Sequence, residues 1–407
     1  MKKIFFTFMI FILCIVNVNA LDLSSKNVIM YNLDKDIEVM AINADEVVSI
    51  ASLTKIMTTL VAIEKIKDMD ELVTITYNML LGLKEANAYV IDLYVGDKVS
   101  YRELLYGTFL ASGADAVRAL AFSLSGSEEN FVKEMNIKAK SFGLTNTNFV
   151  NATGLDAEGH KSTVKEVAIM LKAALENDIF KAIYETETYK FTNKNLTVNN
   201  STLSSFALLD FDSSYIIGGK TGYTYDAGRC LASTAYDSVN DIHYMLITVR
   251  ADIDRTKLYH IRDTKAIYDY VFQNYKYHPI INNGDSLVTL SVEYSKEKNR
   301  IFNISKNLDY YSDSSFDENK IEITYDGVNL LTHKMKIGDK LGTVTIKYDN
   351  ELLDTVVLAL DKEVDFSLGV YLYENIYVVS IIGISIILFI TITIILIHKK
   401  RKKKRKK

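Results

Sequence analysis

The sequence is poor in cysteine and histidine, and each shortage excludes a class of protein. Of 407 residues only two are cysteines, Cys14 and Cys230, and Cys14 lies in an apolar N-terminal run. A scaffold held by disulfides is therefore excluded, and the fold must depend on ordinary apolar cores, for which the chain is long enough. The six histidines are scattered without the His-Glu-x-x-His spacing of zinc hydrolases, so we expect no metal site and no cofactor.

Basic residues are also outnumbered by acidic ones outside the two ends of the chain. The formal net charge is −4, and setting aside the nine cations of the C-terminal tail together with Lys2 and Lys3 leaves −15 for the rest. An acidic body repels phosphate backbones, which argues against nucleic acid as a partner.

The first twenty residues have the pattern of a secretory signal. A basic start, Met1-Lys2-Lys3, precedes an apolar run from Ile4 to about Val18 and a small residue, Ala20. This order predicts a cleavable signal peptide over residues 1–20, with an uncleaved anchor as the alternative.

The other end has the pattern of a membrane anchor. Residues 376–397 are uncharged and mostly aliphatic, and at about 1.5 Å per residue such a helix spans roughly 33 Å, enough for a bilayer. The basic tail, 398–407, follows directly and favours a cytoplasmic C-terminus. We therefore predict a single-pass cell-membrane protein whose body is extracellular and whose partners include membrane lipid.

The chain has a single proline, Pro279, and the hydrophobic pattern changes around it. After it, short alternating runs lie between turn signals such as Asp326-Gly327, as in a small β domain. We predict a mixed α/β domain over 24–275 and a β-rich domain over 280–368. Before the proline, apolar residues recur at helical spacing over Ile56 to Ile66, Tyr101 to Leu124, Glu128 to Lys140, Thr163 to Leu175 and Arg262 to Phe272.

The stretch "IASLTKIMTT", residues 50–59, places a serine and a lysine in an apolar helix. Ser52 and Lys55 lie three residues apart, so their side chains come together on one face. A lysine can take a proton from a serine hydroxyl only when the lysine is neutral, as burial or a second cation makes it. Alone the pattern is weak, because Ser-x-x-Lys also begins at Ser162 and Ser295, where a helix cap and a charged stretch explain it.

Two further sequence motifs make it improbable that the Ser-x-x-Lys pattern at Ser52 arose by chance. Ser112-Gly113-Ala114 lies where a loop enters an apolar helix, and Lys220-Thr221-Gly222 lies at the start of a strand pattern. A Lys-Thr-Gly on an edge strand offers a cation, a hydroxyl and an unobstructed backbone, which together can hold the terminal carboxylate of a peptide. Lys220 would also be the second cation that keeps Lys55 neutral.

In this order the elements resemble the Ser-x-x-Lys, Ser-x-Asn and Lys-Thr-Gly motifs of penicillin-recognising serine enzymes. "ASLTKIMTTLVAIE", "LLYGTFLASGADAVRALA" and "KTGYTYDAGRCLAST" are similar to the D-alanyl-D-alanine carboxypeptidases, the low-molecular-mass penicillin-binding proteins. The resemblance implies an α+β fold. It would be a DD-peptidase/β-lactamase-like domain, with an antiparallel sheet flanked by helices, followed by a small all-β domain and a C-terminal transmembrane helix.

The resemblance also implies roles for the catalytic residues. Ser52 would be the acylated nucleophile, Lys55 its general base, and Ser112 would relay a proton toward the leaving D-alanine. The substrates would be peptidoglycan stem peptides ending in D-Ala-D-Ala, and β-lactams would be inhibitors.

The binding residues follow from the third motif. Lys220 and Thr221 would bind the terminal carboxylate, and Gly222 would leave the backbone open. The backbone N–H groups of Ser52 and Tyr223 would form the oxyanion hole.

Two departures from the family pattern leave alternatives open. Ala114 stands where the family usually has an asparagine that grips a substrate carbonyl, and His260 stands where members often carry an arginine. Ala114 favours a catalytically weak or inactive protein that binds cell wall with the same fold. A β-lactamase is the other alternative, although the sequence shows no acidic residue placed to drive deacylation.

Overall fold

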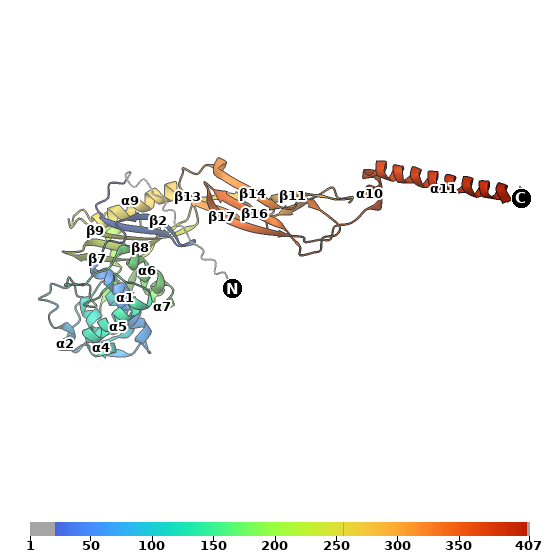
Figure 1. Cartoon of the computed structure of the whole chain (residues 1–407). Coiled ribbons are helices and arrows are strands. Elements are labelled where there is room, and N and C mark those ends of the chain that lie inside the picture. Colours follow the sequence, from blue (N-terminus) through green and yellow to red (C-terminus); the bar gives the residue numbers. More distant parts are fainter. Residues whose placement is uncertain (1–20, 255, 405–407) are drawn as a thin grey trace. The chain divides into compact units, whose positions relative to one another are not determined.

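Figure 1 shows the computed structural model of the chain, which describes residues 21–254 and 256–404. The predicted signal peptide, 1–20, lies outside the described residues. The chain divides into two compact units, the first ending at Gln273 and the second beginning at Asn274. The largest apolar core belongs to the first unit, and a second core lies within residues 281–364 of the second unit.

The first unit is built on a five-stranded antiparallel sheet with the strand order β2-β1-β9-β8-β7. The central strands β8 and β9 are largely buried, which fits the small and apolar residues that make up most of both sequences. β7 lies at the edge of the sheet, as predicted for the strand with the Lys-Thr-Gly sequence. The strands are β1 Asn27–Asn32, β2 Ile37–Ile42, β7 Ile216–Thr224, β8 Gly228–Asp237 and β9 Ile242–Ala251.

Helices cover both faces of this sheet, with α9 on one side and α1, α4 and α5 on the other in Figure 1. α9, Tyr259–Asn274, is tied to the sheet by a 3.0 Å hydrogen bond between the hydroxyls of Tyr268 and Ser233. The remaining elements of the unit are η2 Ala51–Thr54, α1 Lys55–Lys65, β3 Leu72–Thr74, α2 Tyr77–Leu80, β4 Lys98–Ser100, α3 Tyr101–Phe109, α4 Ala114–Ser125, α5 Glu128–Ser141, α6 Val164–Leu175, α7 Asp178–Tyr184, β5 Thr188–Lys190, β6 Thr197–Asn199 and α8 Ser201–Leu208.

The single helical stretch predicted from Tyr101 to Leu124 is wrong, because it forms two helices. α3 ends at Phe109 and α4 begins at Ala114. Between them Ser112 has a φ of 65°, a left-handed conformation that no residue of a right-handed helix adopts. The break places Ser112 on a loop between two rigid helices.

The second unit consists mainly of short antiparallel sheets around a small apolar core. Asp326-Gly327, predicted as a turn, are instead the last two residues of β14 and pair with β16. The elements are β10 Lys276–Ile281, β11 Ser286–Val292, β12 Asn299–Asn303, β13 Leu308–Ser312, η3 Glu318–Lys320, β14 Ile321–Gly327, β15 Leu330–Leu331, β16 Lys340–Tyr348 and β17 Glu351–Ala359.

Two helices follow the β strands. α10 spans Leu368–Glu374. Its last residue, Glu374, forms an ion pair of 2.8 Å with Lys298, which directly precedes β12. α11, Ile376–Lys404, contains the predicted span 376–397. Among the described residues it is the one helix long and apolar enough to cross a membrane.

Candidate active site

A large cleft in the first unit brings the predicted motifs together. Its volume is about 1180 Å³, and it is bordered by the start of α1, the loop before α4 and the edge strand β7. The seventh predicted residue, Lys220, is fully buried and is not among the lining residues. The other six line the cleft: Ser52, Lys55, Ser112, Thr221, Gly222 and Tyr223.

Ser52 and Lys55 are in direct contact. Ser52 lies in η2, the short 3-10 helix that leads into α1, so the predicted α-helix begins at Lys55 and not before Ser52. The Lys55 Nζ lies 3.0 Å from the Ser52 Oγ and donates to the backbone carbonyl of Thr153 at 2.6 Å. These two partners fix the amine against the hydroxyl. In its neutral form the amine can accept the hydroxyl proton.

Burial is the first cause of the unusual pKa of Lys55. The side chain is 2% exposed, and desolvation lowers its pKa to about 7 against the opposing pull of Asp115 and Glu128. At neutral pH about half of the molecules therefore hold this amine uncharged.

Lys220 is fully buried within β7 and interacts electrostatically with Lys55. Its Nζ donates to the carbonyl of Thr221 at 2.9 Å. Burial, and then repulsion from Lys55, holds the pKa of Lys220 well below its ordinary value. Repulsion between two cations is reciprocal, so Lys220 also disfavours the charged form of Lys55. Burial is the first cause of the lowered pKa at both residues.

The edge strand passes close to the serine, and glycine favours this approach. A Cβ at Gly222 would stand 3.1 Å from the backbone nitrogen of Ser52. The N–H groups of Ser52 and Tyr223 thus lie on neighbouring segments, as an oxyanion hole requires. The Lys-Thr-Gly motif was predicted at the start of a strand, but it lies within β7. The hydroxyls of Thr221 and Ser201 are 2.7 Å apart.

The second motif forms the opposite wall of the cleft. Ser112 is half-buried and its φ of 65° is strained for a residue with a side chain, a feature typical of functional positions. Ala114 is buried and donates its backbone N–H to Tyr89 at 2.8 Å. The next residue, Asp115, accepts the N–H groups of Ile91 and Leu93 at 3.0 Å. The cleft wall is thus fixed to α4 by a carboxylate and a backbone bond.

Three supporting residues escaped prediction as site residues: Thr153, Gly154 and His160. The His160 Nδ1 accepts the N–H of Val150 at 3.1 Å, so its Nε2 carries the hydrogen and donates to Thr54 at 2.8 Å. Burial lowers the pKa of His160 to about 4, which keeps the ring neutral. In the sequence, Thr153 and Gly154 lie in the stretch "NFVNATGLD" and His160 follows it shortly after. The sequence alone could not show which atoms these residues contact.

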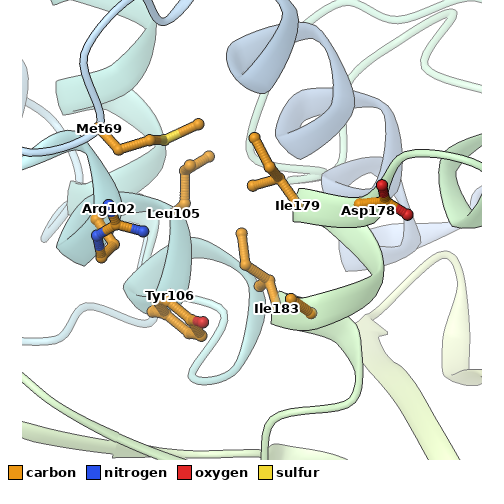
Figure 2. Close-up of a pocket in the computed structure, with 8 residues that line it drawn as sticks. Met69, Arg102, Leu105, Tyr106, Asp178, Ile179 and Ile183 are labelled. Carbon is orange, nitrogen blue, oxygen red and sulfur yellow. The ribbon is translucent and has the colours of Figure 1, made fainter.

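A second, smaller cavity of about 200 Å³ lies between α3 and α7 (Figure 2). Arg102 lines this cavity, and its guanidinium is paired with Asp70 at 2.9 Å. The cavity contains none of the motif residues, so it is not the active site. Its lining is Met69, Arg102, Leu105, Tyr106, Asp178, Ile179, Ala182 and Ile183.

A serine in contact with a buried lysine, beside an edge strand, is the arrangement that an activated serine nucleophile requires. Comparison with known families agrees. Residues 15–252 match the D-alanyl-D-alanine carboxypeptidases, and residues 275–365 match the C-terminal domain of penicillin-binding protein 5. The chain belongs to the D-alanyl-D-alanine carboxypeptidase family of serine peptidases, as the sequence motifs predicted.

Individual relatives give the same assignment. D-alanyl-D-alanine carboxypeptidase DacF of Bacillus subtilis is 32% identical over 320 residues, which cover 76% of this chain and 78% of that protein. D-alanyl-D-alanine carboxypeptidase DacC of Escherichia coli is 35% identical over 223 residues, covering 53% of this chain and 54% of that one.

Solved structures confirm the α+β fold. Penicillin-binding protein 5 from Haemophilus influenzae superposes with a TM-score of 0.60 at 22% identity, covering 85% of this chain and 99% of that chain. The Streptomyces K15 DD-transpeptidase superposes with a TM-score of 0.55 at 28% identity, covering 62% of this chain and 98% of that chain.

Proposed function

We propose that this chain removes the terminal D-alanine from peptidoglycan stem peptides through an acyl-enzyme on Ser52, at the outer face of a membrane. The observation that carries the proposal is the 3.0 Å contact between the Ser52 Oγ and the Nζ of Lys55, whose pKa burial lowers to about 7. A neutral amine in this position activates an otherwise weak nucleophile.

The reaction follows from the positions of the side chains. Lys55 takes the hydroxyl proton, and the Ser52 Oγ attacks the carbonyl carbon of the penultimate D-alanine. The N–H groups of Ser52 and Tyr223 receive the oxyanion. Ser112, on the opposite wall, passes a proton to the leaving amine as the C–N bond breaks. Water then hydrolyses the ester with Lys55 again as the base.

Substrate binding uses the edge strand. An extended stem peptide adds alongside β7, where Gly222 leaves the backbone accessible and the Thr221 hydroxyl meets the terminal carboxylate. Lys220 donates to the Thr221 carbonyl of the same strand. Ala114 offers no amide to the substrate carbonyl, and the loss of one such hydrogen bond costs about 1–3 kcal/mol, so we expect a slow enzyme rather than an inactive one.

The membrane anchor is α11. Its apolar stretch and the nine cations at the end of the chain favour a span with the tail in the cytoplasm and both folded units outside. Membrane lipid is then a partner of α11 alone.

The test is intact-mass spectrometry of the full chain in detergent with benzylpenicillin. We expect a lasting adduct on the wild type and none on Ser52→Ala. Ser295→Ala is the matched control, because Ser295 begins another Ser-x-x-Lys sequence in the second unit, and it should keep the adduct.

Two other results would change the assignment. An adduct that clears within seconds would indicate a β-lactamase. The absence of any adduct on the wild type would overturn the acyl-enzyme mechanism and favour a wall-binding protein with the same fold.

A further inference from the structure

The amine of Lys55 is held by a segment that has no regular secondary structure of its own. The Thr153 carbonyl accepts from the Lys55 Nζ at 2.6 Å, and the Ala152 carbonyl accepts from the Thr58 hydroxyl at 2.7 Å. Lys55 and Thr58 both belong to α1, whereas residues 149–155 lie in neither a helix nor a strand. The position of the amine in the site therefore depends on what fixes the backbone of this segment.

Two side chains of α5 supply hydrogen bonds to the segment. The Asn136 amide donates to the Phe149 carbonyl at 2.8 Å and accepts the Phe149 N–H at 2.9 Å. The Glu128 Oε1 accepts the N–H of Ala152 at 3.0 Å. Ala152 is 0% exposed, and a buried N–H without an acceptor is unfavourable. Asn136 thus holds the start of the segment, and Glu128 holds the residue directly before Thr153.

Glu128 is itself held in place by Arg118 of α4. The Arg118 Nε lies 3.5 Å from the Glu128 Oε2, and the two side chains are only 17% and 23% exposed. The guanidinium also donates to the backbone carbonyls of Leu81 and Asn78, the latter at 3.0 Å. Because these bonds orient the guanidinium, the ion pair leaves the other carboxylate oxygen, Oε1, directed at the Ala152 N–H.

Glu128 is also one of the charged groups that act on the Lys55 amine. Asp115 of α4 and Glu128 of α5 favour the protonated form of the amine, and Lys220 of β7 opposes that form by repulsion. His160, from the loop before α6, is neutral because burial lowers its pKa to about 4. Removing the charge of Glu128 should therefore lower the pKa of Lys55 further.

We infer that Glu128 is a positioning residue of the proposed acyl-transfer reaction. By holding Ala152 it fixes the adjacent Thr153 carbonyl, and that carbonyl holds the Lys55 amine against the nucleophile. This inference rests on the proposed function, and it adds to the site a residue of α5, an element that none of the three sequence motifs includes.

The alternative is that Glu128 only stabilises its helix, because a carboxylate in the first turn of a helix is favourable. α5 has two such residues, Glu128 and Glu129. Glu129 forms an ion pair of 2.8 Å with Lys133, and its side chain is 80% exposed. Glu129 thus shares the position at the start of α5 without the hydrogen bond to Ala152, which makes it the matched control.

The test measures the second-order acylation rate constant of the full chain in detergent with benzylpenicillin between pH 5 and 9. Glu128→Gln keeps an oxygen for the Ala152 N–H but removes the charge, so we expect the midpoint of the pH profile to fall by roughly half a unit or more. Glu128→Ala also removes the hydrogen bond. We expect it to lower the plateau rate constant at high pH by about tenfold or more, because the amine is no longer aligned with the hydroxyl.

Glu129→Gln and Glu129→Ala should change neither the midpoint nor the plateau. Thermal melting verifies that each variant is folded. A variant that is merely less stable would lose folded protein without moving the midpoint. If Glu128→Ala does not fold, the midpoint of Glu128→Gln decides.

The failures are distinguishable. A wild-type midpoint in Glu128→Gln, or a wild-type plateau in Glu128→Ala, overturns the inference about Glu128 and leaves the proposed function standing. Equal changes in the Glu129 variants overturn it as well, since stabilisation of the helix would then explain both. If the wild type is not acylated at any pH, the proposed function fails and the inference fails with it.

Discussion

At the scale of single residues, the chemistry depends on the burial of one lysine. An exposed lysine is charged at neutral pH and cannot accept a proton. At Lys55, desolvation lowers the pKa to about 7, although Asp115 and Glu128 both favour the charged form. Burial therefore outweighs the two carboxylates and is the first cause of the lowered pKa.

The lowered pKa of Lys55 predicts that the acylation rate depends on pH. Below pH 7 Lys55 is protonated and cannot act as a base, so the acylation rate constant for benzylpenicillin should rise about tenfold per pH unit there. It should level off above about pH 7.5. The two histidines at the site, His160 and His260, have pKa values lowered to about 4 and about 3, so they stay neutral throughout this range.

The measurement is the acylation rate between pH 5 and 9. Lys55→Arg is the control, since arginine stays protonated and should lose about a hundredfold or more of the rate at every pH. A flat profile for the wild type would contradict the assignment of Lys55 as the base.

The residues that sequence could and could not predict differ in a simple way. Ser52 and Lys55 are neighbours in the chain, so helical spacing sufficed. Thr153 contacts α1 across 98 residues and His160 contacts η2 across 106 residues, and no local pattern reports such contacts.

At the scale of elements, the site depends on how closely a loop approaches η2. Ala51 has a φ of 46° and Gly154 a φ of 80°, and a Cβ at Gly154 would collide with the Ala51 carbonyl. Glycine is required there for both its conformation and its lack of a side chain.

We therefore predict that Gly154→Ala destabilises the protein and displaces Ser52. The strain of a positive φ costs about 1 kcal/mol, and the collision with backbone should add about 2 kcal/mol or more. The acylation rate should fall as well, because η2 carries the nucleophile. Urea denaturation and the rate with benzylpenicillin measure the two effects.

Gly143→Ala is the matched control, because Gly143 has a similar φ of 74° with no atom within 4 Å of an added Cβ. It should show the conformational cost of about 1 kcal/mol alone and an unchanged acylation rate. Equal losses of stability in the two variants would mean that the contact with Ala51 does not constrain η2.

Prediction of the elements succeeded where periodicity was long. α1, α5 and α6 begin and end within about two residues of the predicted stretches, because one face of each is apolar over several turns. The short helices α7 and α8 were not predicted, since seven or eight residues give too few repeats. The loop at Ser112 was predicted from its Ser-Gly sequence, although the helical spacing alone continues through it, and the structure has α4 beginning at Ala114.

At the scale of the whole molecule, the apolar segments near the two ends of the chain indicate a membrane location, whereas the two folded units carry no such indication. The change of pattern at Pro279 indicated a second, β-rich unit, and the structure has β strands there from Lys276 onward. The membrane assignment, in contrast, depends on composition alone, since α11 has an apolar surface around its whole circumference.

The proposed orientation can be tested because the chain is nearly free of cysteine. Cys230 is 0% exposed, and burial raises its pKa to about 12, so it should not react with maleimides. Cys14 lies within the predicted signal peptide. Single cysteines can therefore be added as position markers: Val239→Cys, on the β8–β9 turn where the side chain is 88% exposed, and His398→Cys, directly after the apolar stretch.

In intact cells that express the chain, a membrane-impermeant maleimide should label Val239→Cys and should not label His398→Cys until the membrane is permeabilised. A nine-cation tail is held on the cytoplasmic side because moving it across the bilayer is strongly unfavourable. Labelling of His398→Cys in intact cells would overturn the proposed orientation. Labelling of the otherwise unaltered chain would instead locate the reaction at Cys14 and show that the N-terminal segment is retained, so the same experiment decides between a signal peptide and a second anchor.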